Sequence, residues 1–95
     1  MPAYFIANIT VTNPEGIKEY QALAPATIEA YGGRYIVRGG AHETLEGDWK
    51  PDRMVVLEFP DVETARTWYN SPEYQEILPL RQDNSDGKIV LVEGL

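Results

Sequence analysis

Two arginines and a histidine form the part of this chain best suited to chemistry. Arg34 and Arg38 enclose a short apolar stretch between two glycine pairs, and His42, the single histidine, follows shortly after. A guanidinium binds carboxylates and other oxyanions, and an imidazole can transfer protons near neutral pH. We therefore take Arg38 and His42 as candidate catalytic residues, with Arg38 orienting an anionic or carbonyl oxygen. The alternative for His42 is a solvated loop residue.

Arg34 has a different candidate partner. Glu58 is the one acid in the otherwise apolar end of the run 53–59. A hairpin that pairs Arg38 with Met54 also pairs Arg34 with Glu58, and residues two apart share a face of a strand. A lone buried carboxylate is costly. We therefore expect a structural ion pair between Arg34 and Glu58, with both arginines on the same face.

One amide and three aromatic side chains are candidate ligand-binding residues. Asn8 interrupts an apolar run, and an inward amide on a central strand needs a hydrogen-bond partner. Trp49 lies in a polar connection, where it could cover a pocket or pack on a partner chain. Tyr69 and Tyr74 could donate hydrogen bonds to a ligand. Packing in the core is the alternative for both tyrosines.

The elements that must position these residues follow from periodicity and caps. Strands are predicted at 4–11, 34–38, 53–59 and 88–93. Helices are predicted to start at Asn13-Pro14-Glu15, Pro60-Asp61 and Ser71-Pro72-Glu73. A polar connection is predicted at 41–51 and a loop at 81–87. This order predicts an α+β, ferredoxin-like βαββαβ fold, in which helices cover one face of an antiparallel sheet. The length fits a single domain, residues 1–95.

The hydrophobic pattern of the strands is not the one expected for a monomer of this fold. Residues 54–57 and 89–92 are apolar on both faces, although the helices can cover only one of them. A large exposed apolar patch is rare on soluble monomers. We expect a homodimer that packs sheet face against sheet face. The alternative is that some of these valines are simply half-exposed.

Composition excludes several classes of function. The net charge of −7 argues against binding to nucleic acids or anionic membranes, and the absence of cysteine excludes thiol chemistry. One histidine falls short of the usual nitrogen ligands of a metal site, and no phosphate loop or dinucleotide motif is present. We expect no metal and no cofactor. Because the N-terminus lacks a signal pattern and no segment could span a membrane, we expect a cytoplasmic protein.

Three stretches together resemble a known family. They are GGRYIVRGG (32–40), LEGDWKPDRMVVLEFPD (45–61) and ARTWYNSPEYQ (65–75). The chain resembles the bacterial domain-of-unknown-function family 1330, within the dimeric α+β barrel superfamily. The resemblance implies a homodimer whose two sheets form a barrel. The wider superfamily includes cofactor-free monooxygenases, lyases, isomerases and haem-handling proteins, so fold alone does not fix a reaction.

Two functions remain open at this point. One is a cofactor-independent enzyme, monooxygenase-, isomerase- or lyase-like, that acts on a small anionic or carbonyl-containing metabolite. The other is a non-catalytic homodimer that binds a small molecule or has a structural role. A deep pocket containing Arg38, His42 and tyrosines would favour the first, whereas a pocket filled by Trp and Leu side chains would favour the second.

Overall fold

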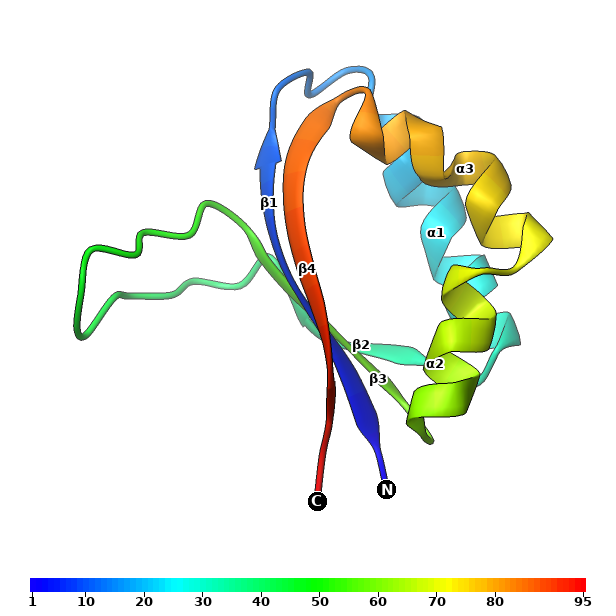
Figure 1. Ribbon diagram of the computed structural model, residues 1–95. Coiled ribbons are helices and arrows are strands. Elements are labelled where there is room, and N and C mark those ends of the chain that lie inside the picture. Colours follow the sequence, from blue (N-terminus) through cyan, green and yellow to red (C-terminus); the bar gives the residue numbers. More distant parts are fainter.

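The computed structural model describes residues 1–95 as one antiparallel sheet with three helices on one of its faces (Figure 1). The elements are β1 (Ala3–Val11), α1 (Lys18–Ala30), β2 (Arg34–Arg38), β3 (Met54–Phe59), α2 (Val62–Tyr69), α3 (Pro72–Gln82) and β4 (Ser85–Glu93). The strand order is β2-β3-β1-β4. The predicted ferredoxin-like βαββαβ fold is confirmed. None of the helices is long and apolar enough to cross a membrane.

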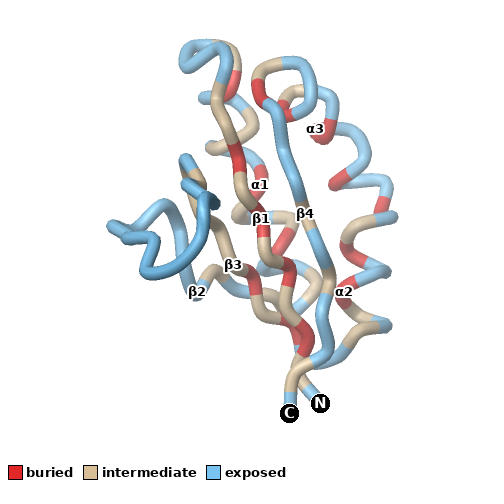
Figure 2. The backbone as a smooth tube through the Cα atoms, turned by 60° about the vertical axis from the view of Figure 1, so that its left-hand side comes forward, coloured by how far each residue is buried: buried red, intermediate tan, exposed pale blue.

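The central strand β1 divides the sheet into an inner face, covered by the helices, and an outer face. Ala3, Phe5, Ala7 and Ile9 are buried, and the residues between them are only partly buried. Figure 2 shows the buried positions alternating along β1, while β4 is mostly exposed. This alternation follows from the pleat of a strand, which points successive side chains to opposite faces.

Aromatic rings form the centre of the core on the inner face. The ring centroids of Trp68 and Tyr74 are 4.1 Å apart, and those of Phe5 and Trp68 are 5.3 Å apart with a steep interplanar angle. The Trp68 indole N–H donates to the hydroxyl of Thr27 at 3.1 Å. Each large aromatic ring removes much apolar area from water, and contacts between rings add to that stabilisation.

The starts of α2 and α3 follow the predicted caps. The Asp61 carboxylate accepts a hydrogen bond from the Thr64 N–H at 2.7 Å, and the Ser71 hydroxyl accepts one from the Tyr74 N–H at 3.2 Å. Pro72 occupies the first turn of α3. These contacts satisfy amide groups that have no partner within the helix.

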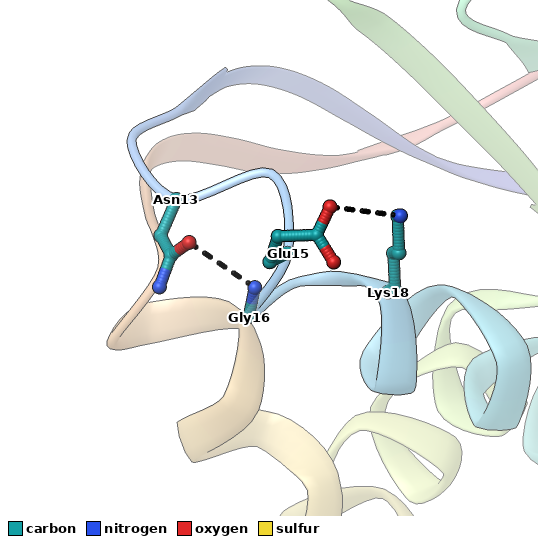
Figure 3. A network of polar contacts seen from close by, with 4 residues as sticks. All are labelled: Asn13, Glu15, Gly16 and Lys18. Carbon is teal, nitrogen blue, oxygen red and sulfur yellow. Dashed lines mark hydrogen bonds and ion pairs between the residues drawn. The ribbon is translucent and has the colours of Figure 1, made fainter.

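The start of α1 differs from the prediction. The Asn13 side chain accepts a hydrogen bond from the Gly16 N–H at 3.2 Å, and the Lys18 ammonium contacts the Glu15 carboxylate at 3.0 Å (Figure 3). The helix itself begins at Lys18, after Ile17, which makes no side-chain cap. Asn13 therefore closes a turn before the helix, because an asparagine amide can satisfy the backbone of a turn as well as that of a helix.

The predicted loop 81–87 is also wrong. Helix α3 continues to Gln82, and β4 begins at Ser85, so only residues 83–84 connect them. Ser85 and Gly87 pair with Val11 and Ile9 of β1. The polar residues at the start of β4 form a strand because the long central strand offers them hydrogen-bond partners. The local composition of residues 85–87 does not reveal that these partners exist.

Between β2 and β3, residues 39–53 form an extended arm without helix or strand. It projects from the sheet on the side opposite the helices (Figure 1). Gly39 and Gly47 have positive φ angles of 70° and 85°, which glycine adopts without strain. The arm agrees with the predicted polar connection at 41–51, although it is slightly longer.

Candidate functional site

A cavity of about 70 Å³ lies between the inner face of the sheet and the helices. That space holds several water molecules or one small organic group. Most of its lining is apolar or aromatic, and three guanidinium groups, those of Arg38, Arg53 and Arg81, are the only charged groups in it. An apolar cavity with a few convergent polar groups is typical of a small-molecule site.

A β-bulge in β2 places Arg38 in this cavity. Arg34 pairs with Glu58 and Tyr35 with Leu57, but Arg38 pairs with Val55, because the register shifts by one residue between Tyr35 and Val37. Arg34 therefore lies on the outer face and Arg38 on the inner face. The predicted pairing of Arg38 with Met54, and with it the shared face of the two arginines, is wrong, because a bulge inserts a residue that reverses the alternation.

Arg38 and Arg53 enter the cavity from the two ends of the arm. The Arg38 guanidinium donates to the backbone carbonyl of Gln21 at 3.2 Å and lies 4.6 Å from the centre of the Tyr35 ring. The Arg53 guanidinium lies against Gly39, where any Cβ would collide with it. Glycine at position 39 thus meets two needs, a positive φ and close approach of a cation.

Arg81 is the most buried of the three arginines. Only 7% of its surface is exposed, and its Nε–H has no hydrogen-bond partner. A Cβ at Gly87 would lie 2.6 Å from one of its terminal nitrogens, so that glycine leaves room for the guanidinium. Burial lowers the pKa of Arg81, but nearby tyrosine hydroxyls, led by Tyr74, outweigh this effect and the pKa is raised overall. The side chain is therefore a buried cation without a carboxylate partner.

No carboxylate neutralises these three arginines. The ion pairs of the structure are Lys18–Glu15 and Arg34–Glu58, and neither involves a cavity residue. No Asp, Glu or His lines the cavity. Only Arg81 of the three is buried, whereas Arg53 is partly buried and Arg38 is exposed. Because an uncompensated buried cation is costly, Arg81 favours an anion in the cavity.

Tyrosine hydroxyls supply neutral donors beside the cations. The hydroxyls of Tyr20 and Tyr74 are 2.8 Å apart. Burial raises the pKa of Tyr20 strongly and that of Tyr35 as well, although Arg38 opposes the second shift. Both therefore stay protonated near neutral pH. Two hydroxyls that share one hydrogen bond use one of their two protons, so the other proton can be donated to a ligand.

Not every predicted site residue reaches the cavity. Arg38, Tyr69 and Tyr74 line it, but His42, Trp49 and Asn8 do not. His42 is exposed on the arm, where one ring nitrogen lies 2.7 Å from the Pro51 carbonyl oxygen. Asn8 is on the outer face, and its side-chain oxygen accepts a hydrogen bond from the Asp52 N–H at 3.1 Å. Within one subunit, His42 is thus not placed beside Arg38 as a base.

The contact between Arg34 and Glu58 lies on the outer face. The Arg34 Nε is 2.7 Å from a Glu58 carboxylate oxygen, and the Tyr4 hydroxyl donates to the other oxygen at 3.3 Å. The Arg34 side chain is 70% exposed, so the pair is not buried, and its single contact through Nε means that it is not bidentate. Exposed pairs of this kind contribute about 0–1 kcal/mol. Its structural role stays a prediction.

Two cavity arginines, Arg53 and Arg81, escaped the sequence analysis. A signal for Arg81 was present, since it follows Tyr74 by seven residues and Ile77 by four, which places it on the same helical face. A signal for Arg53 was also present, since it begins the predicted strand 53–59 and shares a face with Val55 and Leu57, although the sequence does not show that this face meets the helices. No group of three or more His, Asp or Glu side chains is placed to hold a metal ion.

Comparison with known proteins extends the resemblance. The profile of the family "Domain of unknown function (DUF1330)" matches residues 2–95. No curated protein matches the chain.

Solved structures share the fold at low sequence identity. A protein of unknown function from Rhodopseudomonas palustris has a TM-score of 0.78 at 20% identity, over 99% of this chain and 82% of that one. SnoaB, a cofactor-independent oxygenase from Streptomyces nogalater, has a TM-score of 0.67 at 16% identity, over 99% and 93%. A dimeric ferredoxin-like protein of unknown function from Jannaschia sp. CCS1 has a TM-score of 0.67 at 13% identity, over 99% and 100%. At such identities the likeness establishes the fold alone.

Proposed function

We propose that this chain, which belongs to the DUF1330 family, is a homodimer in which each subunit binds a small, mostly apolar anion in the inner cavity. One observation carries this proposal: three guanidinium groups, with no carboxylate partner, line an otherwise apolar space. Carboxylates, phenolates and enolates are the small organic groups that such cations bind.

The cavity is polar at one end, which orients the ligand. Around Phe5 the neighbours across the sheet are Leu57 and Leu91, and the Trp68 ring packs against Phe5. Two of the cations belong to neighbours of Ile9. Arg53 lies opposite it across the strands, where the Ile9 N–H donates to the Arg53 carbonyl at 2.9 Å. Its other neighbour, Gly87, adjoins the Arg81 guanidinium. The acidic group of a ligand therefore belongs near Ile9 and its apolar part near Phe5.

A charged hydrogen bond from a cavity guanidinium makes the preference for an anion quantitative. A hydrogen bond that includes a charged group contributes about 1.5–3 kcal/mol. A neutral amide or alcohol of the same shape would leave the cations uncompensated. We therefore expect a carboxylate to bind about 10–100-fold more tightly than its matching primary amide.

The outer face supports the proposed dimer. Its middle row, Val37, Val56, Ile6 and Val90, consists of apolar side chains that face the same way on four neighbouring strands. Val90 is 59% exposed and Val37 is 38% exposed in a single subunit. A second copy would cover this row with an identical one, as two-fold symmetry allows. The Jannaschia protein, described as dimeric, supports this assembly.

Turnover of the bound anion is a second candidate, favoured by the Tyr20–Tyr74 pair. A neutral hydroxyl with a spare proton, together with a guanidinium, can stabilise an enolate oxygen by hydrogen bonding. The cavity holds no carboxylate or imidazole to act as base, so the substrate would have to be acidic itself. SnoaB is described as a cofactor-independent oxygenase, which supports a reaction of this general kind on the same fold.

A paired ligand screen tests the binding proposal. Thermal unfolding would be recorded with small carboxylates and phenols, each beside its neutral amide or methyl ether. We expect stabilisation by some acids and not by their neutral partners, lost in Arg81→Met and retained in Arg34→Met, whose guanidinium lies on the outer face. Equal shifts with acids and neutral analogues, or no shift with any compound, would contradict the proposal.

Turnover needs a separate measurement. For each acid that binds, exchange of its α or ring protons in D₂O would be followed by NMR, with oxygen consumption recorded in parallel. We expect a rate above the buffer control that decreases in Tyr74→Phe while binding persists. Binding without proton exchange or oxygen uptake would support the binding function alone and would exclude turnover of that ligand.

A further inference from the structure

The arm (residues 39–53) carries two large apolar side chains that are mostly exposed in a single subunit. Leu45 is 83% exposed and Trp49 is 61% exposed. Both lie on a segment that projects beyond the sheet on the outer side (Figure 1). Tryptophan is rarely left open to water over most of its surface, and it is enriched at the centres of protein interfaces.

Hydrogen bonds within the arm hold it in shape. The Thr44 hydroxyl donates to the Trp49 carbonyl at 2.6 Å, and a His42 ring nitrogen lies 2.7 Å from the Pro51 carbonyl oxygen. At the base of the arm, Asp52 is bound through its N–H to Asn8 and through its carboxylate to the Thr10 hydroxyl, at 3.1 and 2.5 Å. The arm thus presents Trp49 from a preorganised segment, which lowers the entropic cost of binding.

The outer face beside the arm is suited to another copy of the same chain. Its charges nearly balance, since Arg34 and Lys88 face the same way as Glu58, Asp86 and Asp52, whereas the whole chain carries −7. Two otherwise acidic molecules can therefore approach on this face with little repulsion. The apolar middle row supplies the burial that a stable interface needs.

We propose that the arm of each subunit extends over the second subunit of the homodimer, where Trp49 and Leu45 pack against the partner. The inference rests on the dimer of the proposed function and adds the contact that holds it together. Arm and apolar row lie on the same side of the sheet, so a partner that covers the row also lies beside the arm. Under two-fold symmetry both arms make the same contact, and no third protein is required.

Trp49 itself can report the contact. The chain has one other tryptophan, Trp68, which is buried in the core. Subtracting the fluorescence spectrum of Trp49→Phe from that of the wild type therefore leaves the emission of Trp49. Acrylamide quenching of this difference signal would be measured across a dilution series, with light scattering on the same samples. We expect the quenching constant to fall several-fold, and the emission to shift to the blue, as the dimer forms.

Two arm variants measure the contribution of the contact. Trp49→Ala should weaken the dimer by about 30-fold or more, as buried aromatic anchors commonly do. Glu43→Ala, an exposed arm residue, should leave the dimer dissociation constant within about threefold. Circular dichroism of both variants verifies that the fold persists.

The outcomes separate the two proposals. A dimer in which Trp49 is quenched as freely as in dilute monomer, and in which Trp49→Ala has no effect, would overturn the role of the arm and keep the homodimer. A chain that scatters as a monomer at every concentration would remove both. Ligand binding in the cavity is tested independently of either result.

Discussion

The two faces of the sheet use the same four strands in opposite ways. The inner face is closed by helices and combines an aromatic core with a cavity lined by three cations. The outer face has no covering layer and offers a row of half-exposed aliphatic side chains, with two cations and three acids around it. The difference shows that the inner face determines whether a subunit folds, and we infer that the outer face determines what it assembles with.

A single residue separates the two faces in β2. The bulge between Tyr35 and Val37 sends Arg34 outward to Glu58 and Arg38 inward to the cavity. Two arginines that are identical in type, and four residues apart, therefore belong to different environments. Each prediction below alters one side of this division and asks whether the other side responds.

The largest effect is expected from the core of the inner face. Trp68→Ala should lower the free energy of unfolding by about 3–5 kcal/mol, because it removes a buried ring and its hydrogen bond to Thr27. Urea denaturation followed by circular dichroism measures the change. Trp49→Ala is the matched control at concentrations where the chain is monomeric, and it should cost less than about 0.5 kcal/mol. Equal costs for the two tryptophans would remove the distinction between the faces.

A charge in the middle row of the outer face should act on assembly and leave folding intact. Val90→Lys places an ammonium in each half of the proposed interface, so the dimer should weaken by about 100-fold or more. Sedimentation equilibrium measures the dissociation constant. Glu76→Gln, on the exposed surface of α3, changes the net charge by the same amount and should have no effect. A Val90→Lys dimer as tight as the wild type would place the interface elsewhere.

The bulge residue itself should be dispensable for the placement of Arg38. Deletion of Ile36 restores regular alternation in β2 with Arg34 still opposite Glu58 and Arg38 still opposite Val55, so each arginine should keep its face. We expect the deletion to leave anion affinity within about threefold of wild type, whereas Arg38→Gln should lower it about 10-fold because one charged hydrogen-bond donor is lost. Calorimetry with an acid found in the screen measures both variants. Unchanged affinity in Arg38→Gln would mean that Arg38 does not contact the ligand.

The smallest effect concerns a cap at the edge of the inner layer. The hydrogen bond from the Thr64 backbone N–H is the main reason that the pKa of Asp61 lies below its ordinary value of 3.8. A carboxyl group with a lowered folded-state pKa stabilises the protein above its unfolded pKa, and this contribution disappears as the pH falls through the folded value. Asp61→Asn, which keeps a capping oxygen without charge, should differ from wild type in Tm near about pH 6 and not near about pH 2. A difference that is constant with pH would contradict the assignment.

The candidate site was only partly predictable from the sequence. Arg38, Tyr69 and Tyr74 were selected by residue type and position, and all three line the cavity. Arg81 was missed although its helical spacing from Tyr74 was visible, because an arginine late in a helix is usually a solvated side chain that favours the helix C-terminus. The exposure of His42 depends on where the arm goes, which no local pattern encodes.

The sequence by itself determined the type and order of the elements. Runs of β-branched and aromatic residues, apolar helical periodicity and the caps Asp61 and Ser71 are local signals, and they sufficed for the βαββαβ fold. Only the tertiary structure decided three other features. They are the bulge that assigns Arg38 to the inner face, the extension of β4 back to Ser85 along β1, and the convergence of Arg53 and Arg81 on one cavity. Each depends on pairing between distant segments, whose energy comes from partners that local sequence does not specify.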